Sequence, residues 1–167
     1  SSGWGISLSG SSQNRLADNI LTGNNRGMRI GCGTTANTIT GNRITDSIDT
    51  GVNFNWGTYC AGSNGNHFYD NYFSNANNVN VGGLTSTWNT TQTPGPNIEC
   101  GPFIGGNYWG QPDGNGFSQL CPNNDDDGFC DTVYDRGGTN IDYLPLTTGH
   151  RNITTCQTIM QAGDIKW

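Results

Sequence analysis

A short sequence pattern recurs along the first half of the chain and constrains the fold more than any other feature. A glycine is followed by an apolar, a polar and an apolar residue at residues 5–8, 27–30 and 51–54, with an imperfect copy at 78–81. Alternation of this kind predicts a short β-strand with one buried face. The chain is therefore expected to return several times to the same sheet.

Pairs of asparagines spaced five residues apart follow these segments. They occur in three segments that align with one another, residues 14–22, 37–45 and 66–74, and residues 106–110 resemble the second half of the same unit. Two positions of the alignment are always apolar: Leu16, Ile39 and Phe68 share one, and Leu21, Ile44 and Phe73 share the other. An asparagine at a corner tolerates left-handed backbone and can hydrogen-bond along a stack, so we expect these asparagines to be structural.

The distance between successive units grows from 23 to 29 to 36 residues, counted on the second asparagine of each pair. Insertions at residues 55–65 and 82–100 account for the growth. Such repeats predict an all-β fold, a short parallel β-helix (β-solenoid) of about four coils, because each coil buries its apolar side chains only by stacking on the next. We expect one domain, with coils at 1–110, an Asp-rich loop region at 111–149, and a tail at 150–167 that forms a strand or a cap.

An unusual density of oxygen donors marks the region after the coils. Asn123, Asp125 and Asp127 alternate before Gly128, and Asp131 follows. Alternating Asx residues ahead of a glycine can wrap a hard cation, which predicts a structural Ca²⁺ site in a loop. Tyr134 stands where an EF-hand would have its closing Glu, so a helix–loop–helix site is excluded. The alternative is a solvated acidic turn.

Six cysteines form an even set without a zinc-type CxxC spacing: Cys32, Cys60, Cys100, Cys121, Cys130 and Cys156. Disulfides, and so an oxidising compartment, are the better interpretation. We expect Cys121 to pair with Cys130 as a local clamp, and the sequence favours Cys32 with Cys60 and Cys100 with Cys156 only weakly. A bond between molecules is an alternative for any of these last four. Asn89 and Asn152 begin N-x-Thr glycosylation motifs, which suit a secreted surface.

Composition excludes two classes of partner. The formal net charge is −6 with only seven Lys and Arg, so no nucleic-acid partner is expected, because phosphate binding needs a basic face. No apolar run approaches the ~20 residues of a membrane span. Ser1 is not a start methionine, so the chain is expected to be processed or part of something longer.

The repeats resemble those of the NosD-like family of right-handed parallel β-helices. The stretches GNYWGQPDGNGFS, CPNNDDDGFCDTVYD and NIDYLPL at residues 106–118, 121–135 and 140–146 are similar to the C-terminal ends of NosD-like surface or sheath proteins of methanogenic archaea. The resemblance implies a right-handed helix, an extracytoplasmic location and an Asp-rich loop closed by Cys121 and Cys130. The family name suggests copper, but the chain offers only scattered soft or imidazole ligands for it: His67, His150, Met28 and Met160.

No catalytic constellation is visible. Lys166 is the only lysine, and the arginines Arg29 and Arg43 have no acidic set at the same register. Asp18 and Asp70 share a position on alternate coils, with Gly41 between them, and we interpret them as solvated corner residues. Aromatic residues in the insertions are better candidates for contact with sugars or neighbouring molecules: Trp56, Tyr59 and Trp88.

These observations favour a structural protein of the cell exterior, such as a subunit of a sheath, surface layer or fibre. Strand edges left open at the ends of a short solenoid would let copies of the chain stack into a homopolymer. Disulfides and Ca²⁺ would harden that assembly. The alternative is a carbohydrate-binding or carbohydrate-processing β-helix, whose insertions would form a lip over a groove.

Overall fold

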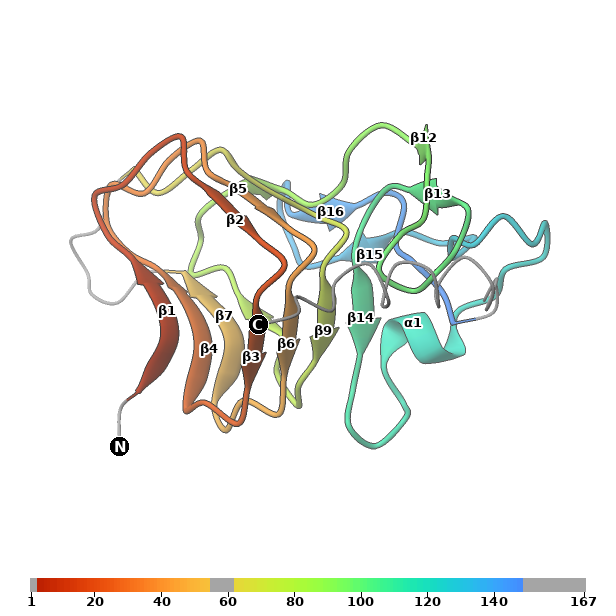
Figure 1. Ribbon diagram of the computed structural model, residues 1–167, viewed down its shortest axis with the longest axis horizontal. Helices are drawn as coiled ribbons and strands as arrows, with labels where there is room; N and C mark the ends of the chain where they lie inside the picture. The colour runs from red at the N-terminus through yellow and green to blue at the C-terminus, as the bar shows by residue number, and fades with distance from the viewer. Residues whose placement is uncertain (1–2, 55–61, 149–167) are drawn as a thin grey trace, which may run out of the picture.

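The computed structural model describes residues 3–54 and 62–148, in which short strands dominate (Figure 1). Twelve of the strands form three parallel sheets of four strands each. The first sheet contains β1 (Trp4–Leu8), β4 (Arg26–Ile30), β7 (Thr50–Phe54) and β10 (Val79–Asn80). The second contains β2 (Arg15–Ala17), β5 (Thr38–Thr40), β8 (Asn66–Tyr69) and β11 (Ser86–Thr87). The third contains β3 (Ile20–Thr22), β6 (Arg43–Thr45), β9 (Tyr72–Ser74) and β14 (Tyr108–Gly110).

The chain visits the three sheets in turn, so each circuit adds one strand to each sheet. Figure 1 shows the circuits following one another from β1 toward β14. The pairing places Leu16 opposite Ile39 and Ile39 opposite Phe68. The arrangement agrees with the predicted parallel β-helix, and the register expected from the asparagine spacing is confirmed.

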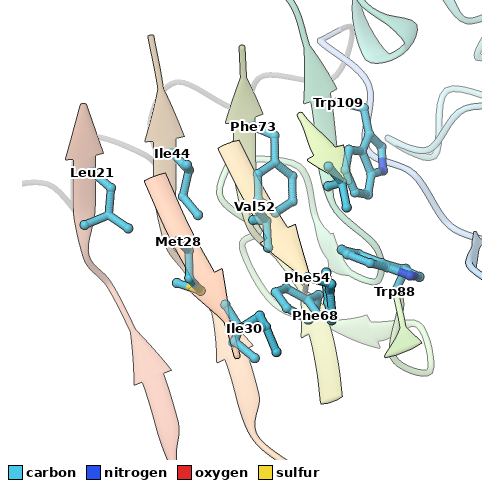
Figure 2. Packing of buried hydrophobic residues seen from close by; sticks show 12 residues of the cluster. Leu21, Met28, Ile30, Ile44, Val52, Phe54, Phe68, Phe73, Trp88 and Trp109 are labelled. Atoms are coloured by element: carbon cyan, nitrogen blue, oxygen red, sulfur yellow. The ribbon is translucent and has the colours of Figure 1, made fainter. Parts of the chain in front are cut away.

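Side chains stacked along the sheets build the core. Figure 2 shows Leu21, Ile44, Phe73 and Trp109 following one another on neighbouring strands. The ring of Phe73 stacks on that of Trp109, with centroids 4.7 Å apart. Burial of these apolar faces between the sheets is the main favourable term in the fold.

Glycine is the second residue of β7 because the interior there has no room for a side chain. A Cβ on Gly51 would lie 2.6 Å from Nδ2 of Asn75, whose side chain fills the neighbouring corner. The corner between the second and third sheets needs a different backbone: Asp18, Gly41 and Asp70 occupy it with φ of 59°, 69° and 55°. Aspartate and glycine are among the residues that tolerate this left-handed conformation best.

The fourth circuit departs from the sequence prediction. The insertion expected at residues 82–100 contains β11, which extends the second sheet beyond β8. The extra chain lies between β11 and β14, where β12 (Thr93–Pro94) and β13 (Phe103–Ile104) pair antiparallel. Residues 55–61 of the other predicted insertion lie outside the described part of the chain.

Residues 111–148 cover the C-terminal end of the β-helix, so the prediction of open ends is wrong at this end. They include α1 (Phe117–Leu120), β15 (Tyr134–Asp135) and β16 (Ile141–Asp142). Figure 1 shows α1 next to β14, on the side away from β9. The ring of Tyr134 stacks on Trp109 with centroids 4.5 Å apart, and Leu146 forms a parallel bridge with Tyr108. The guanidinium of Arg136 donates a hydrogen bond to the carbonyl of Val79 in the last strand of the first sheet, at 2.8 Å.

Candidate functional site

The most elaborate polar arrangement in the described chain is a buried row of amides at the corner between the second and third sheets. Each circuit contributes one residue to it, in the order Asn19, Asn42, Asn71, Asn107 and then Asp142. Asn42, Asn71 and Asn107 are completely buried. We call this row the asparagine ladder. The five-residue spacing seen in the sequence places the first three members there.

The asparagine ladder has a direction. The backbone N–H and Nδ2 of Asn42 both donate to Oδ1 of Asn71, at 3.1 and 2.9 Å. Asn71 donates in the same way to Oδ1 of Asn107, at 3.2 and 2.9 Å. Each Nδ2 also donates to backbone carbonyls, as Asn71 does to Ile39 at 2.8 Å. Between members of the ladder, Asn42, Asn71 and Asn107 therefore each accept from the previous side chain and donate to the next one.

Asp142 ends the ladder with a carboxyl group whose two oxygens both accept hydrogen bonds. Its Oδ2 accepts hydrogen bonds from the backbone N–H of Asn107 and from Nε1 of Trp109, at 2.8 and 2.9 Å. Its Oδ1 accepts one from the N–H of Leu144 at 3.1 Å. An asparagine here would offer only one acceptor oxygen. Burial raises the pKa of Asp142 to about 7, while these N–H donors oppose the rise.

A second row follows the other asparagine of each pair. Asn14 donates to Asn37 and Asn37 to Asn66, with Nδ2 to Oδ1 distances of 2.9 Å in both cases. Beyond Asn66, Asn140 takes over: its Oδ1 accepts from the N–H of Ser86 and from Nε1 of Trp88, at 3.0 and 3.1 Å. Sequence analysis missed the capping roles of Asn140 and Asp142. The signal was the pair of Asx residues in NIDYLPL, spaced two apart instead of five.

The predicted metal-site residues form a turn held by its own backbone. Oδ1 of Asn123 accepts from the N–H of Asp127 at 3.2 Å, and Oδ1 of Asp127 accepts from the N–H of Phe129 at 2.8 Å. Asp125 also accepts from the N–H of Asp127, and Asp131 accepts from Asn124. Within the described residues, no three His, Cys, Asp or Glu side chains gather in a way that could hold a metal ion.

Disulfide bonds secure this turn and other parts of the fold. Cys121 and Cys130 are joined, with Cα atoms 5.4 Å apart, as the local spacing predicted. Cys32 and Cys100 each take part in a disulfide as well, but not with each other. Cys60 and Cys156, the partners suggested for them by sequence, lie outside the described residues, so those two pairings stay predictions.

The corner carboxylates, Asp18 and Asp70, differ in environment. Oδ1 of Asp70 accepts from the N–H of Ile98 at 2.7 Å, and the inserted chain after β11 shields it. Burial raises the pKa of Asp70 to about 7, the N–H of Ile98 lowers it, and the negative charge of Asp18 raises it further. Asp18 is exposed, and its side chain lies beside Gly41, as the shared register predicted.

One predicted surface contact is wrong. Trp88 is only 1% exposed, because it directly follows β11 and its ring stacks on Phe68 with centroids 4.5 Å apart. Trp56, Tyr59 and the glycosylation candidate Asn152 lie outside the described residues. The other candidate, Asn89, is partly buried, and its Oδ1 accepts from the N–H of Tyr143 at 3.3 Å.

Comparison with known protein families identifies the repeats. Residues 1–114 match the family described as periplasmic copper-binding protein (NosD), and the match spans more than half of the chain. The chain belongs to the NosD family. No curated protein and no solved structure matches this NosD-family chain. None of the helices in the described part of the chain is long and apolar enough to cross a membrane.

The described residues of this NosD-family chain do not fit a copper ion. Copper favours thiolate, thioether or imidazole ligands. Cys121 and Cys130 are consumed in a disulfide, Met28 is completely buried in the apolar core, and Nε2 of His67 lies 2.9 Å from the carbonyl oxygen of Asn89. His150 and Met160 lie outside the described residues. We therefore derive no chemistry from copper.

Proposed function

We propose that this protein is a structural subunit of an extracellular assembly such as a sheath, a surface layer or a fibre. The observation that carries the proposal is that its buried polar side chains hydrogen-bond from coil to coil along the β-helix. Asn42, Asn71, Asn107 and Asp142 lie in a continuous row along the β-helix, where they bond to one another and to the backbone. Such a row stiffens a solenoid along its axis, because each coil is tied to the next by side chains as well as by strand pairing.

In this proposal the solenoid has about four coils and is right-handed, as parallel crossover connections almost always are. The periplasmic description of the family indicates an exported protein. In this proposal the exported protein is held at the cell surface. Copies of the chain associate with one another and disulfides harden the product. Because residues 134–146 cover the C-terminal strand edge, association uses other surfaces of the subunit.

We also propose that the turn at residues 123–131 binds Ca²⁺ as a structural ion. The turn carries four aspartates and no lysine or arginine, so its electrostatic repulsion falls when a divalent cation binds. Asn123, Asp125, Asp127 and Asp131 would supply oxygens after giving up hydrogen bonds to the turn's own N–H groups. Calorimetric titration of the chelated protein with Ca²⁺ tests this, with a variant carrying D125N and D131N as the control. Equal heats for the two proteins would refute the site.

The structural role is tested on native cell-envelope material. We expect it to stay too large to enter a gel after boiling in detergent, and to release the subunit when a reductant, or a reductant with a chelator, is added. Disulfides between molecules give this result because detergent does not cleave them. Quantitative release of monomer by detergent alone would contradict the proposal.

Carbohydrate binding is the second candidate, favoured by one surface feature. His67 and Tyr69 point outward from β8, partly exposed, with ring centroids 4.8 Å apart. Aromatic faces of this kind can stack on sugar rings, and the sequence predicts the same role for Trp56 and Tyr59, which precede β8 in the chain. A glycan array with the wild-type protein and Y69A tests it. Binding that is absent, or unchanged in the variant, would count against this surface.

A further inference from the structure

The second row of asparagines lacks one amide, on the fourth coil. Asn37 and Asn66 stand at the same register of neighbouring coils, and the pairing of β11 with β8 places Ser86 opposite Asn66. The backbone N–H of Ser86 donates to Oδ1 of Asn140, just as the N–H of Asn37 donates to Oδ1 of Asn66. Ser86 therefore occupies the place of an asparagine in this row, with a shorter side chain.

The hydroxyl of Ser86 has no partner. Ser86 is 7% exposed, and its buried Oγ forms no hydrogen bond with any described residue. Buried polar groups are normally hydrogen-bonded, so an unpaired one needs an explanation. The same residue lines a cavity of ≈ 190 Å³ together with Gly65, Thr85, Thr87 and Thr139. Because Oγ forms no bond in its present rotamer, rotation toward a ligand in the cavity breaks none.

The lining of this cavity is polar and uncharged. Thr85, Thr87 and Thr139 are exposed at its mouth, and each has a hydroxyl that can donate or accept. Among the described residues that line it there is no charged side chain to pair with a phosphate or a carboxylate, and no aromatic side chain to hold an apolar ligand. The cavity therefore suits a neutral group that both donates and accepts hydrogen bonds.

An amide is such a group, and amides already occupy this register on earlier coils. Oδ1 of Asn66 accepts from the N–H and Nδ2 of Asn37, while Nδ2 of Asn66 donates to the carbonyl of Thr34. A ligand amide beside Ser86 would take up the unpaired hydroxyl in the same manner. A water molecule takes about 30 Å³, so the cavity has room for an amide and part of the group that carries it.

The outer face of β8 indicates what carries the amide. Thr87 pairs in register with His67, and the partly exposed rings of His67 and Tyr69 lie 4.8 Å apart on that face. Aromatic faces of this kind can stack on sugar rings. We propose that the cavity beside Ser86 binds the acetamido group of an N-acetylated hexosamine in a neutral glycan. The sugar ring next to it lies against His67 and Tyr69.

This inference rests on carbohydrate binding, the second candidate function, because it names the sugar that the outer face of β8 would bind. The two can fail separately. If acetylated and unacetylated sugars bound equally well and Y69A abolished the binding of both, carbohydrate binding would stand and the acetamido site would be overturned.

Isothermal titration calorimetry with two trisaccharides tests the proposal. N-acetylchitotriose and cellotriose have the same ring, linkage and length, and they differ only in the acetamido group that replaces one hydroxyl on each ring. We expect N-acetylchitotriose to bind about tenfold more tightly, because a site that hydrogen-bonds a ligand group discriminates against the analogue that lacks it. Equal affinities for the two sugars, or binding of neither, would overturn the proposal.

The variant S86N supplies the missing amide from the chain itself. Its side chain should fill the cavity and weaken the binding of N-acetylchitotriose about tenfold. Its urea unfolding midpoint should be no lower than that of the wild type, because Asn37 and Asn66 show that this register accepts an asparagine. Wild-type affinity in folded S86N would overturn the proposal.

A second variant changes only the mouth of the cavity. T139V keeps the shape of an exposed side chain and removes its hydroxyl, so it should fold normally and weaken the binding of N-acetylchitotriose about threefold. T132V is the matched control, because Thr132 is also exposed but is not among the described residues that line the cavity. Affinity unchanged in T139V, or reduced equally in T139V and T132V, would overturn the proposal.

Discussion

Replacing Asn71 should destabilise the protein by an amount that depends on the direction of the asparagine ladder. In N71A the backbone N–H of Asn42 loses the buried acceptor that it reaches at 3.1 Å, and the carbonyl of Ile39 loses a donor at 2.8 Å. An unsatisfied buried donor costs about 1–3 kcal/mol and each lost hydrogen bond about 0.5–1.5 kcal/mol. We therefore expect the free energy of unfolding to fall by roughly 3–5 kcal/mol in N71A.

The variant N71D separates the effect of hydrogen-bond direction from the effect of side-chain volume. N71D keeps the volume and the accepting oxygen, but it replaces Nδ2 with a second oxygen that faces Ile39 O and Asn107 Oδ1. We expect N71D to be at least as destabilised as N71A at neutral pH, and to recover partly in acid, where a protonated carboxyl can donate. N14A is the matched control, because the side chain of Asn14 is exposed and its backbone N–H keeps its bond to Asn37.

Equilibrium unfolding in urea, followed by tryptophan fluorescence with the disulfides intact, measures all three variants. Trp88 and Trp109 report on the core because both are almost completely buried. An N71D protein as stable as wild type would refute the direction of the ladder. An N71A protein that loses no more than N14A would refute its energetic importance.

Three further predictions concern the buried end of the β-helix and the raised carboxyls. D142A leaves the backbone N–H groups of Asn107 and Leu144 and the indole N–H of Trp109 without an acceptor, and should cost roughly 4 kcal/mol or more in urea unfolding. D142N should cost less because it keeps one oxygen. Burial raises the pKa of Asp70 and of Asp142 from 3.8 to about 7, so both bind protons more tightly in the folded state. The stabilisation that comes from this tighter proton binding is therefore complete below pH 3.8 and is lost as the pH rises toward 7. The free energy of unfolding falls by at most about 1.4 kcal/mol for each pH unit and each of the two groups. If the free energy of unfolding of D70N and of D142N fell with pH as steeply as that of the wild type between pH 3.8 and 7, Asp70 and Asp142 would not cause this pH dependence. W88A should lower stability by about 3–5 kcal/mol and leave any glycan binding unchanged, and a loss of glycan binding in folded W88A would contradict its burial.

The first three coils could be predicted from the sequence because local patterns specify them twice. Alternation around Gly27 and Gly51 gives the strands, and the asparagine pairs give the corners and the register. Both signals arise from the same requirement, that each coil must repeat the last along the axis. The structure agrees with them wherever both are present.

The fourth coil could be predicted only in part, because it lacks the first asparagine of the pair that marks the earlier coils. Ser86 stands where the earlier coils have Asn37 and Asn66, so β11 was assigned to an insertion and Trp88 to the surface. The cover over the last coil could not be predicted either. Asn140 and Asp142 reach the ends of the polar rows from a segment with no strand-like repeat, and only the three-dimensional path brings them there.

The Asp-rich turn shows a different limit of sequence reasoning. The spacing of Asp125, Asp127 and Asp131 predicts oxygen donors close together in sequence, and the structure puts them in one turn. Whether carboxylates point at one ion or accept N–H bonds from their own backbone depends on side-chain torsions that spacing does not specify. Here each accepts a hydrogen bond or more from the turn.

Electron microscopy of native cell-envelope material, with and without reductant, tests the structural role most directly. The account predicts ordered filaments, hoops or sheets that loosen when the disulfides are reduced. Single particles in both samples would contradict it, and would direct attention to carbohydrate binding at the outer face of β8.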